Sequence, residues 1–298
     1  MHDCIVIGAG PAGLTAATYL RRFRRDVQVL DGGRSRALWI PKSHNCPGFP
    51  GGVSGEELLC RLREQAASYG VRLTPTRAVS LQPIDDDFEV GDESGGSLRA
   101  RTVLLATGIV DELPDVPWIE RALSCTAVRL CPICDAYEAA GQRIAMYGPA
   151  ARILSHALFL RTYSAHVTIA PSDAESLDEA ELATAKAADI PVLRGPVQLD
   201  FDGHRCTCTD ADGCVHPVDV VYPSMGSRSQ SSLATRVGAK VDDNGELIVS
   251  PKQMTSVEGL YAIGDVVSAL NQIAVALGHA AIAATEIHNR LPRHLASR

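Results

Sequence analysis

The chain has 298 residues, a formal net charge of −7 and 46% hydrophobic residues. This length suggests about two domains with buried cores, and the modest acidic charge argues against a nucleic-acid-binding surface. No apolar run approaches the roughly 18 residues of a membrane span, so no membrane partner is expected. No signal peptide precedes the first predicted strand, and the nine cysteines lack the spacing of a secreted disulfide scaffold. We therefore expect a cytoplasmic protein.

The first thirty residues have the pattern of a βαβ unit. Residues 4–7 form a short predicted strand, 15–23 a helix, and 27–30 a second strand followed by Asp31. This order is the one that a dinucleotide-binding fingerprint requires. The helix N-terminus would face phosphates with free N–H groups, and the Asp31 carboxylate could accept a hydrogen bond from a ribose hydroxyl.

A glycine-rich loop joins the first predicted strand to the helix. It reads Gly8-Ala9-Gly10-Pro11-Ala12-Gly13. Gly8 permits the tight turn, Gly10 lets the backbone approach a pyrophosphate, and Gly13 lets the helix pack against the strand. A glycine pattern alone is weak. With strand, helix and acid in place it predicts a nucleotide site rather than an ordinary turn.

The later segments repeat this plan with a β-meander, a second βαβ-like unit, a second meander and a final apolar helix. Their ranges are 79–105 for the first meander; 143–148, 153–163 and 167–170 for the second unit; 197–222 for the second meander; and 259–265 before the helix. We predict an α/β fold of two Rossmann-like nucleotide-binding domains (βαβ plus β-meander), one inserted in the other. The outer domain would comprise 1–113 and 246–298, and the inserted domain 114–245.

Two cysteines form a CxxC motif in Cys131-Pro132-Ile133-Cys134-Asp135. Such a pair could be a zinc half-site, a structural thiol pair or a redox centre. No second CxxC stands at zinc-ribbon spacing, which disfavours zinc. Because the chain also carries a dinucleotide fingerprint, the combination predicts disulfide chemistry coupled to a flavin.

Five motifs occur in an order that resembles the low-molecular-weight thioredoxin reductase family of flavoproteins. They are Gly8 to Gly13, His44-Asn45-Cys46-Pro47-Gly48, Ala106-Thr107-Gly108, Cys131 to Asp135, and Ala262-Ile263-Gly264-Asp265-Val266. The resemblance covers nearly the whole chain. It implies that the outer domain binds FAD, that the inserted NAD(P)H-binding-like domain carries the CxxC motif, and that the protein is a homodimer.

The resemblance also implies roles for individual residues. Cys134 would exchange electrons with the flavin, Cys131 would be the interchange thiol, and Asp135 would move the proton. Asp265 would contact the ribityl chain, and Asn45 would lie near the flavin. The complete expected FAD set is Gly8, Gly10, Pro11, Ala12, Gly13, Asp31, Asn45, Ala106, Thr107, Gly108, Gly264, Asp265, Gln272 and Ile273.

The second nucleotide site departs from the family pattern. Its loop reads Gly148-Pro149-Ala150, where Ala150 adds a methyl group and Pro149 removes an N–H donor. After the next strand the family has a basic stretch, whereas residues 170–176 contain two acids and no arginine. These acids would repel a 2′-phosphate. Asp173 is left as a weak candidate for a ribose contact, and the usual use of NADPH is not expected.

Three functions follow. The first is an FAD-dependent dithiol/disulfide oxidoreductase whose electron partner is ferredoxin or oxygen, hence a ferredoxin-linked reductase or a dithiol oxidase. The second is an NADPH-dependent thioredoxin reductase with a remodelled pocket. The third is a non-catalytic flavin-binding redox sensor, which would have no need of two thiols and an adjacent acid. The partner would be a thioredoxin-like protein or a small dithiol or disulfide, and the direction of electron flow stays open.

Other polar clusters are better explained by packing. His204, Cys206, Cys208, Cys214 and His216 crowd one segment, but residues 205–209 and 215–221 alternate like strands around a hairpin turn. No standard metal-ligand spacing is present, so no metal site is predicted. For Cys46, packing is favoured over a third redox thiol. For His279, capping or packing is favoured over catalysis.

Overall fold

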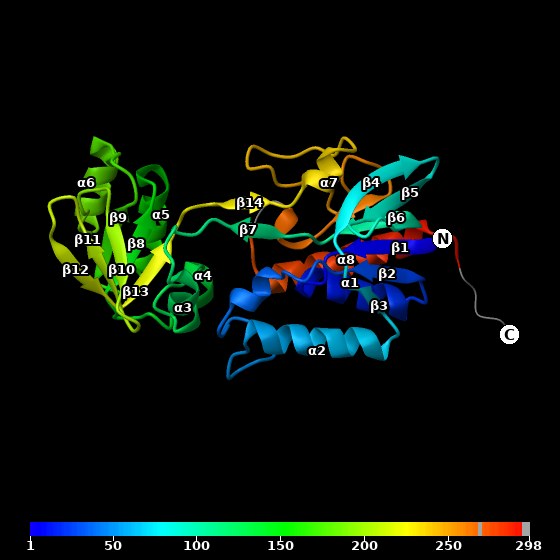
Figure 1. The fold of residues 1–298 in the computed structure, drawn as a ribbon, viewed down its shortest axis with the longest axis horizontal. Helices are drawn as coiled ribbons and strands as arrows, with labels where there is room; N and C mark the ends of the chain where they lie inside the picture. Colours follow the sequence, from blue (N-terminus) through cyan, green and yellow to red (C-terminus); the bar gives the residue numbers. More distant parts are fainter. Residues whose placement is uncertain (268–269, 294–298) are drawn as a thin grey trace.

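A seven-stranded sheet organises the larger of two lobes in this computed structural model, which describes residues 1–267 and 270–293 (Figure 1). The strand order is β3-β2-β1-β6-β5-β4, and β15 also pairs with β6. The strands are β1 (His2–Ile7), β2 (Val27–Leu30), β3 (Arg72–Thr74), β4 (Ala78–Ile84), β5 (Asp87–Asp92), β6 (Ser97–Leu105) and β15 (Leu260–Ala262). Strands β1, β2, β3 and β15 join a parallel array with β6, whereas β4, β5 and β6 form the antiparallel meander.

This sheet is the middle layer of the larger lobe. Successive side chains of a strand point to opposite faces, so each strand can contribute to a core on either side. Cys4 and Val6 of β1 pack with the helices on one face, and Ile5 and Ile7 pack on the other. The continuous apolar run of β1 is therefore buried on both sides. The helices of this lobe are α1 (Pro11–Arg22), η1 (Arg36–Trp39), α2 (Gly55–Ser68), α7 (Ser232–Thr235), η2 (Gly264–Val266) and α8 (Ile273–Arg290).

The smaller lobe contains a parallel sheet in the order β13-β8-β9 and an antiparallel sheet in the order β10-β11-β12. Its strands are β8 (Ile144–Gly148), β9 (Val167–Pro171), β10 (Gln198–Phe201), β11 (Cys206–Thr209), β12 (Val215–Val218) and β13 (Val220–Pro223). Its helices are α3 (Ile119–Ser124), α4 (Pro132–Asp135), α5 (Ala150–Leu160) and α6 (Glu179–Ala187). Together the lobes confirm the predicted fold of two Rossmann-like units with one inserted in the other.

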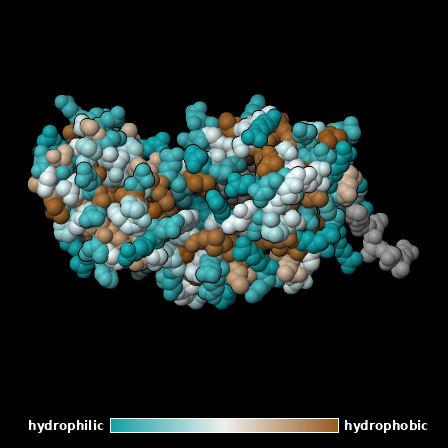
Figure 2. All heavy atoms as spheres, in the orientation of Figure 1, coloured by the Kyte–Doolittle hydropathy of each residue, from teal (hydrophilic) through white to brown (hydrophobic). Residues whose placement is uncertain are grey.

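Two short strands connect the lobes. β7 (Ile109–Asp111) enters the smaller lobe and β14 (Ser227–Ser229) leaves it, and the two pair antiparallel. The molecule narrows at this connection, with hydrophilic and apolar side chains interspersed on the face shown in Figure 2. Within the described residues, no helix is long and apolar enough to cross a membrane.

Several boundaries differ from the sequence-based expectation. Helix α1 begins at Pro11 rather than at residue 15. Helix α5 begins at Ala150 rather than at residue 153, since Pro149 stands before its first turn. The strand expected over 215–221 divides at Asp219, whose carboxylate binds the Arg143 backbone N–H and guanidinium. Leu233 and Ala239 already pack in the core of the larger lobe, ahead of the expected boundary at 246. The limits of the two domains remain predictions.

Candidate redox site

The CxxC cysteines are joined by a disulfide at the start of α4. Cys131 is extended with φ −143°, and Pro132 opens the short helix at a position where its missing N–H costs nothing. The helical turn brings Cys131 and Cys134 to the same side, with an S–S distance of 2.07 Å. The backbone N–H of Cys134 donates to Cys131 Sγ at 3.2 Å. Both side chains are half-buried.

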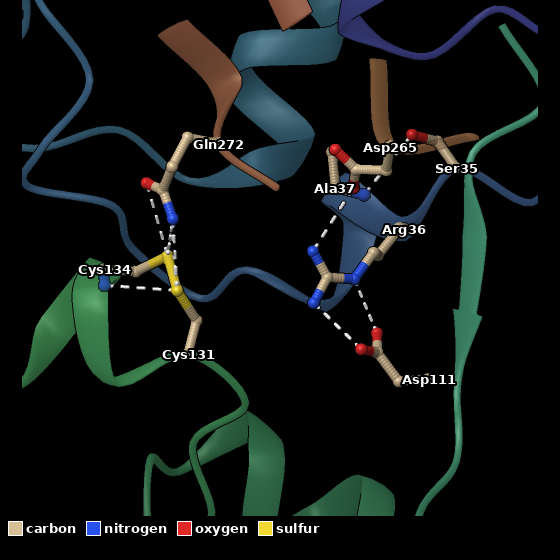
Figure 3. A network of polar contacts seen from close by, with 8 residues as sticks. All are labelled: Ser35, Arg36, Ala37, Asp111, Cys131, Cys134, Asp265 and Gln272. Carbon is tan, nitrogen blue, oxygen red and sulfur yellow. Dashed lines mark hydrogen bonds and ion pairs between the residues drawn. A yellow bond between two sulfur atoms is a disulfide. The ribbon is translucent and has the colours of Figure 1, made fainter. Parts of the chain in front are cut away.

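Two side-chain amides of the larger lobe lie against this disulfide. Gln272 Nε2 is 3.4 Å from Cys134 Sγ and 3.5 Å from Cys131 Sγ (Figure 3). Asn45 Nδ2 donates to Gln272 Oε1 at 2.9 Å and to the Ile133 carbonyl at 3.5 Å. Residues predicted from separate motifs therefore meet at one point between the lobes.

Asp135, the acid of the motif, is held by partners that the sequence did not reveal. Tyr222 of β13 donates its hydroxyl to Asp135 Oδ1 at 2.7 Å, and Arg129 Nη1 lies 4.0 Å from Asp135 Oδ2. Burial raises the pKa of Asp135 to about 6, against the opposing effects of Tyr222 and Arg129. A carboxyl group with such a pKa can take up and release a proton near neutral pH.

The glycine-rich loop of the larger lobe has the close packing that a dinucleotide cradle requires. A Cβ atom on Gly8 would lie 2.3 Å from the Ala106 carbonyl oxygen, and one on Gly13 would lie 1.9 Å from the Gly8 carbonyl oxygen. At Gly10 the nearest atom would be Ser35 Oγ at 3.4 Å, which leaves that backbone open to a ligand. Helix α1 begins without a side-chain cap. These features fit a bound pyrophosphate.

Asp31 follows β2, as the fingerprint requires. Its Oδ1 accepts from the Gly33 backbone N–H at 2.9 Å, and its Oδ2 lies 3.3 Å from Arg63 Nη2. The carboxylate therefore stands at the edge of the loop. Its expected ribose contact is a prediction.

A charged cluster lies beside Asp265 at the start of η2. Arg36 binds Asp111 of β7 through two hydrogen bonds of 2.6 and 2.9 Å, and its Nη1 is 3.4 Å from Asp265 Oδ2 (Figure 3). Burial raises the pKa of Asp265, although Arg36 opposes this shift. His279 Nδ1 is buried without a hydrogen-bond partner among the described residues, and burial lowers the pKa of its ring. Polar groups of FAD could satisfy these side chains, so the cofactor fits this lobe.

The second nucleotide loop differs from the first because a carboxylate, that of Asp173, lies at the N-terminus of its helix α5, whereas α1 has no side-chain cap. The backbone N–H of Ala150, at the start of α5, donates to Asp173 Oδ1 at 3.5 Å. The Asp173 carboxylate therefore lies at the N-terminus of α5, and its expected ribose contact stays a prediction. The backbone of Asp173 packs closely against Gly195, where a Cβ atom would lie 2.2 Å from the Asp173 carbonyl oxygen.

Of the other cysteines named from the sequence, Cys46, Cys206 and Cys208 are core residues, whereas Cys214 is exposed. Cys206 and Cys208 are fully buried, and burial raises the pKa of each thiol to about 12. Cys46 packs with Val53 and Leu58, and burial raises the pKa of its thiol. A raised thiol pKa disfavours the reactive thiolate. Among the residues that the structure describes, no group of histidine, cysteine and acidic side chains could hold a metal ion.

The fold, the CxxC disulfide and the nucleotide cradle define a flavin-dependent disulfide oxidoreductase. The chain belongs to the pyridine nucleotide-disulphide oxidoreductase family, whose model matches residues 2–280. It is 30% identical over 282 residues to the thioredoxin reductase of Mycolicibacterium smegmatis, a match that covers 90% of this chain and 89% of the relative. The likeness to thioredoxin reductases predicted from the motifs is thereby confirmed, and the family binds FAD.

Two solved structures extend this comparison. HlmI is 27% identical with a TM-score of 0.90, covering 97% of this chain and 92% of HlmI. The atypical thioredoxin reductase TRi from Desulfovibrio vulgaris Hildenborough is 28% identical with a TM-score of 0.55, covering 98% and 100%. One of the similar structures is therefore described as an atypical thioredoxin reductase.

Proposed function

We propose that the protein exchanges electrons between a dithiol or disulfide substrate and FAD through Cys131 and Cys134, and that NADPH is not its usual electron partner. The observation that carries the second part is the contact between Asp173 and the Ala150 N–H at the start of α5. A carboxylate there competes with a nucleotide phosphate for the same N–H group and repels its charge. Pro149 removes a further donor from the same loop.

The oxidising direction illustrates the roles of the residues. A substrate thiolate attacks Cys131 Sγ, the S–S bond breaks, and its electron pair leaves with Cys134 as a thiolate. The second substrate thiol then loses its proton and displaces Cys131, which releases an oxidised substrate and leaves the enzyme reduced. Asp135 accepts and returns protons in these steps. Bound FAD supplies the two-electron acceptor for the Cys134 thiolate.

The electron partner would be oxygen for a dithiol oxidase or ferredoxin for a linked reductase. A thioredoxin-like protein or a small dithiol is the proposed substrate, consistent with the name of the Mycolicibacterium relative. The homodimer and the cytoplasmic location remain predictions.

An anaerobic titration of the FAD-loaded protein tests this proposal. We expect slow or negligible bleaching of the flavin by NADPH at sub-millimolar concentration and faster bleaching by dithiothreitol. Cys134→Ser should abolish the dithiol reaction. Cys131→Ser should block turnover but leave a thiolate beside the flavin, visible as a long-wavelength absorption band.

An NADPH-dependent thioredoxin reductase is the second candidate, favoured by the family match and by the name of the Mycolicibacterium relative. Rapid anaerobic bleaching by micromolar NADPH would establish it and reject the first. Wild-type disulfide turnover in both cysteine variants would reject both candidates.

A further inference from the structure

Gln272 occupies an unusual position for a residue that precedes a helix. It is the N-cap residue of α8 in an extended conformation, yet its side chain makes no capping hydrogen bond. N-cap side chains commonly accept from the first-turn N–H groups of their own helix. The amide of Gln272 instead extends to the disulfide of the other lobe and places Nε2 within 3.5 Å of both sulfurs (Figure 3).

A chain of hydrogen bonds fixes which end of this amide faces the sulfurs. The Ser43 hydroxyl donates to Asn45 Oδ1 at 2.9 Å, and Asn45 Nδ2 donates to Gln272 Oε1 at 2.9 Å. Oε1 of Gln272 also lies 3.8 Å from Cys134 Sγ, but it accepts the shorter bond from Asn45, so the NH₂ group is the end that donates to the disulfide. Ser43 is buried, so the chain of donors begins inside the fold.

We propose that the Gln272 side-chain amide is a catalytic hydrogen-bond donor to the sulfur of Cys134 as it becomes a thiolate, and that Asn45 positions this amide. A disulfide sulfur is a weak acceptor, whereas a thiolate is an anion that accepts a charge-assisted hydrogen bond. When the electron pair of the S–S bond moves to Cys134, the contact already in place becomes stronger. A donor that binds the developing charge more tightly than the starting disulfide accelerates the step.

This inference rests on the proposed thiol exchange and adds a residue to it. A thiolate that is better stabilised is also a better leaving group. The amide would therefore favour both cleavage of the disulfide and the reduced state of the pair. A role for Gln272 in holding FAD alone would leave both quantities unchanged, which makes the two roles separable.

The test measures Cys134 directly rather than turnover. In a Cys131→Ser background with FAD bound, the rate of Cys134 alkylation by iodoacetamide is followed across pH by peptide mass analysis. Gln272→Leu should move the pH midpoint of alkylation upward by about one unit, a roughly tenfold loss of thiolate near neutral pH. Gln272→Glu should move it further, because a second anion would face the sulfur.

A second measurement uses the intact pair. The equilibrium of Cys131–Cys134 with dithiothreitol should shift about tenfold toward the disulfide in Gln272→Leu, which corresponds to roughly 30 mV. Gln272→Asn keeps an amide but shortens its reach, so it should behave like Gln272→Leu. The adjacent Asn271→Leu removes an amide that makes no contact with either sulfur in the described structure and should change neither quantity more than about twofold.

The outcomes distinguish this inference from the proposed function. If Gln272→Leu and Gln272→Asn retain normal FAD content and both quantities stay within about twofold of wild type, the amide does not act on the sulfur. If these variants lose FAD, the apoprotein alkylation profile decides, because the Gln272–sulfur contacts involve protein atoms alone. Wild-type turnover in Cys134→Ser would instead remove the thiol exchange on which the inference depends.

Discussion

The carboxyl group of Asp135 is tuned by two side chains from elsewhere in its lobe. Tyr222 is fully buried in β13 and donates to Asp135 Oδ1, while Arg129 precedes the CxxC motif and lies near Oδ2. Burial raises the pKa of Asp135, and both partners pull it back toward its ordinary value. With a pKa of about 6 the acid is mostly charged at physiological pH, yet its neutral form lies close enough in free energy for proton transfer.

Tyr222→Phe should therefore raise the pKa of Asp135 further, since the carboxylate loses a hydrogen bond to its charged form. In dithiol oxidation, which uses Asp135 as a base, the rise of kcat/KM with pH should move from about 6 to higher pH. Profiles of kcat/KM against pH for wild type and variant measure this shift. Tyr163→Phe, in the same lobe, serves as the control, and equal profiles for Tyr222→Phe and wild type would contradict the role of the hydroxyl.

The stability of the folded protein also depends on the ionisation of Asp135, and the raised pKa sets the direction of its dependence on pH. The pKa of Asp135 in the folded protein lies above its ordinary value of 3.8, so the folded state binds this proton more tightly than the unfolded chain. The stabilisation is fully present below about pH 4 and is lost as the pH rises through about 6.

Motif residues could be predicted from the sequence because their spacing is local. Cys131, Cys134 and Asp135 lie within one helical turn, and Gly8 to Gly13 lie within one loop. Tyr222 and Arg36 could not be predicted, because their partners are far along the chain and nothing in their local sequence marks them. Pairing such residues requires the packing of β13 and of η1, which periodicity alone does not give.

At the scale of elements, the proposal about NADPH depends on the first turn of α5, where the Ala150 N–H meets Asp173. Ala150 and Ile153 are both buried, but Ile153 is the first large apolar side chain of the helix, and the sequence pattern predicts the start there. The preceding turn, in which the Ala150 N–H faces Asp173, has no large apolar side chain. Hydrophobic periodicity therefore does not predict that this turn is helical. The N-terminal turn of α5, on which the proposal about NADPH rests, therefore could not be predicted from the apolar residues.

Asp173→Asn should strengthen NADPH binding by several-fold, because it removes a negative charge from the N-terminus of α5. Full affinity should not return, since Pro149 still lacks a donor N–H. Titration of NADPH against the oxidised, FAD-loaded protein measures the dissociation constant. Glu175→Gln removes the same charge from an exposed position two residues away and is the matched control. If both substitutions strengthened NADPH binding equally, the cause would be the loss of one negative charge and not the contact between Asp173 and α5.

At the scale of the whole molecule, the lobes have separate hydrophobic cores. The two main cores of the larger lobe draw on residues up to 106 and from 233 onward, and those of the smaller lobe on residues 113–222. The fold class was predictable because both βαβ units show their own periodicity. The domain limit expected at 246 stays a prediction, and the packing of Leu233 and Ala239 in a core of the larger lobe is a long-range contact that local sequence does not mark.

Separate cores predict two unfolding transitions in calorimetry rather than one. Added FAD should raise only the transition of the larger lobe, since ligands stabilise the unit that binds them. Leu104→Ala in β6 and Met146→Ala in β8 remove comparable buried side chains from the two lobes. Each should destabilise its own transition by about 2–5 kcal/mol and leave the other in place. A single transition that shifts with both substitutions would show that the lobes unfold together.

The pairing of β7 with β14 also affects how the smaller lobe could be exchanged between related proteins. Asp111 of the entering strand pairs with Ser227 of the returning strand, so the two cut points of the insertion are neighbours in space. In terms of chain topology, the whole smaller lobe is inserted between β7 and β14, the two arms of one antiparallel pair. Such a segment can be exchanged as a cassette between relatives, and a chimera joined at β7 and β14 would keep the FAD cradle intact. Exchange of the segment between β7 and β14 would therefore replace the CxxC motif and the second nucleotide loop together.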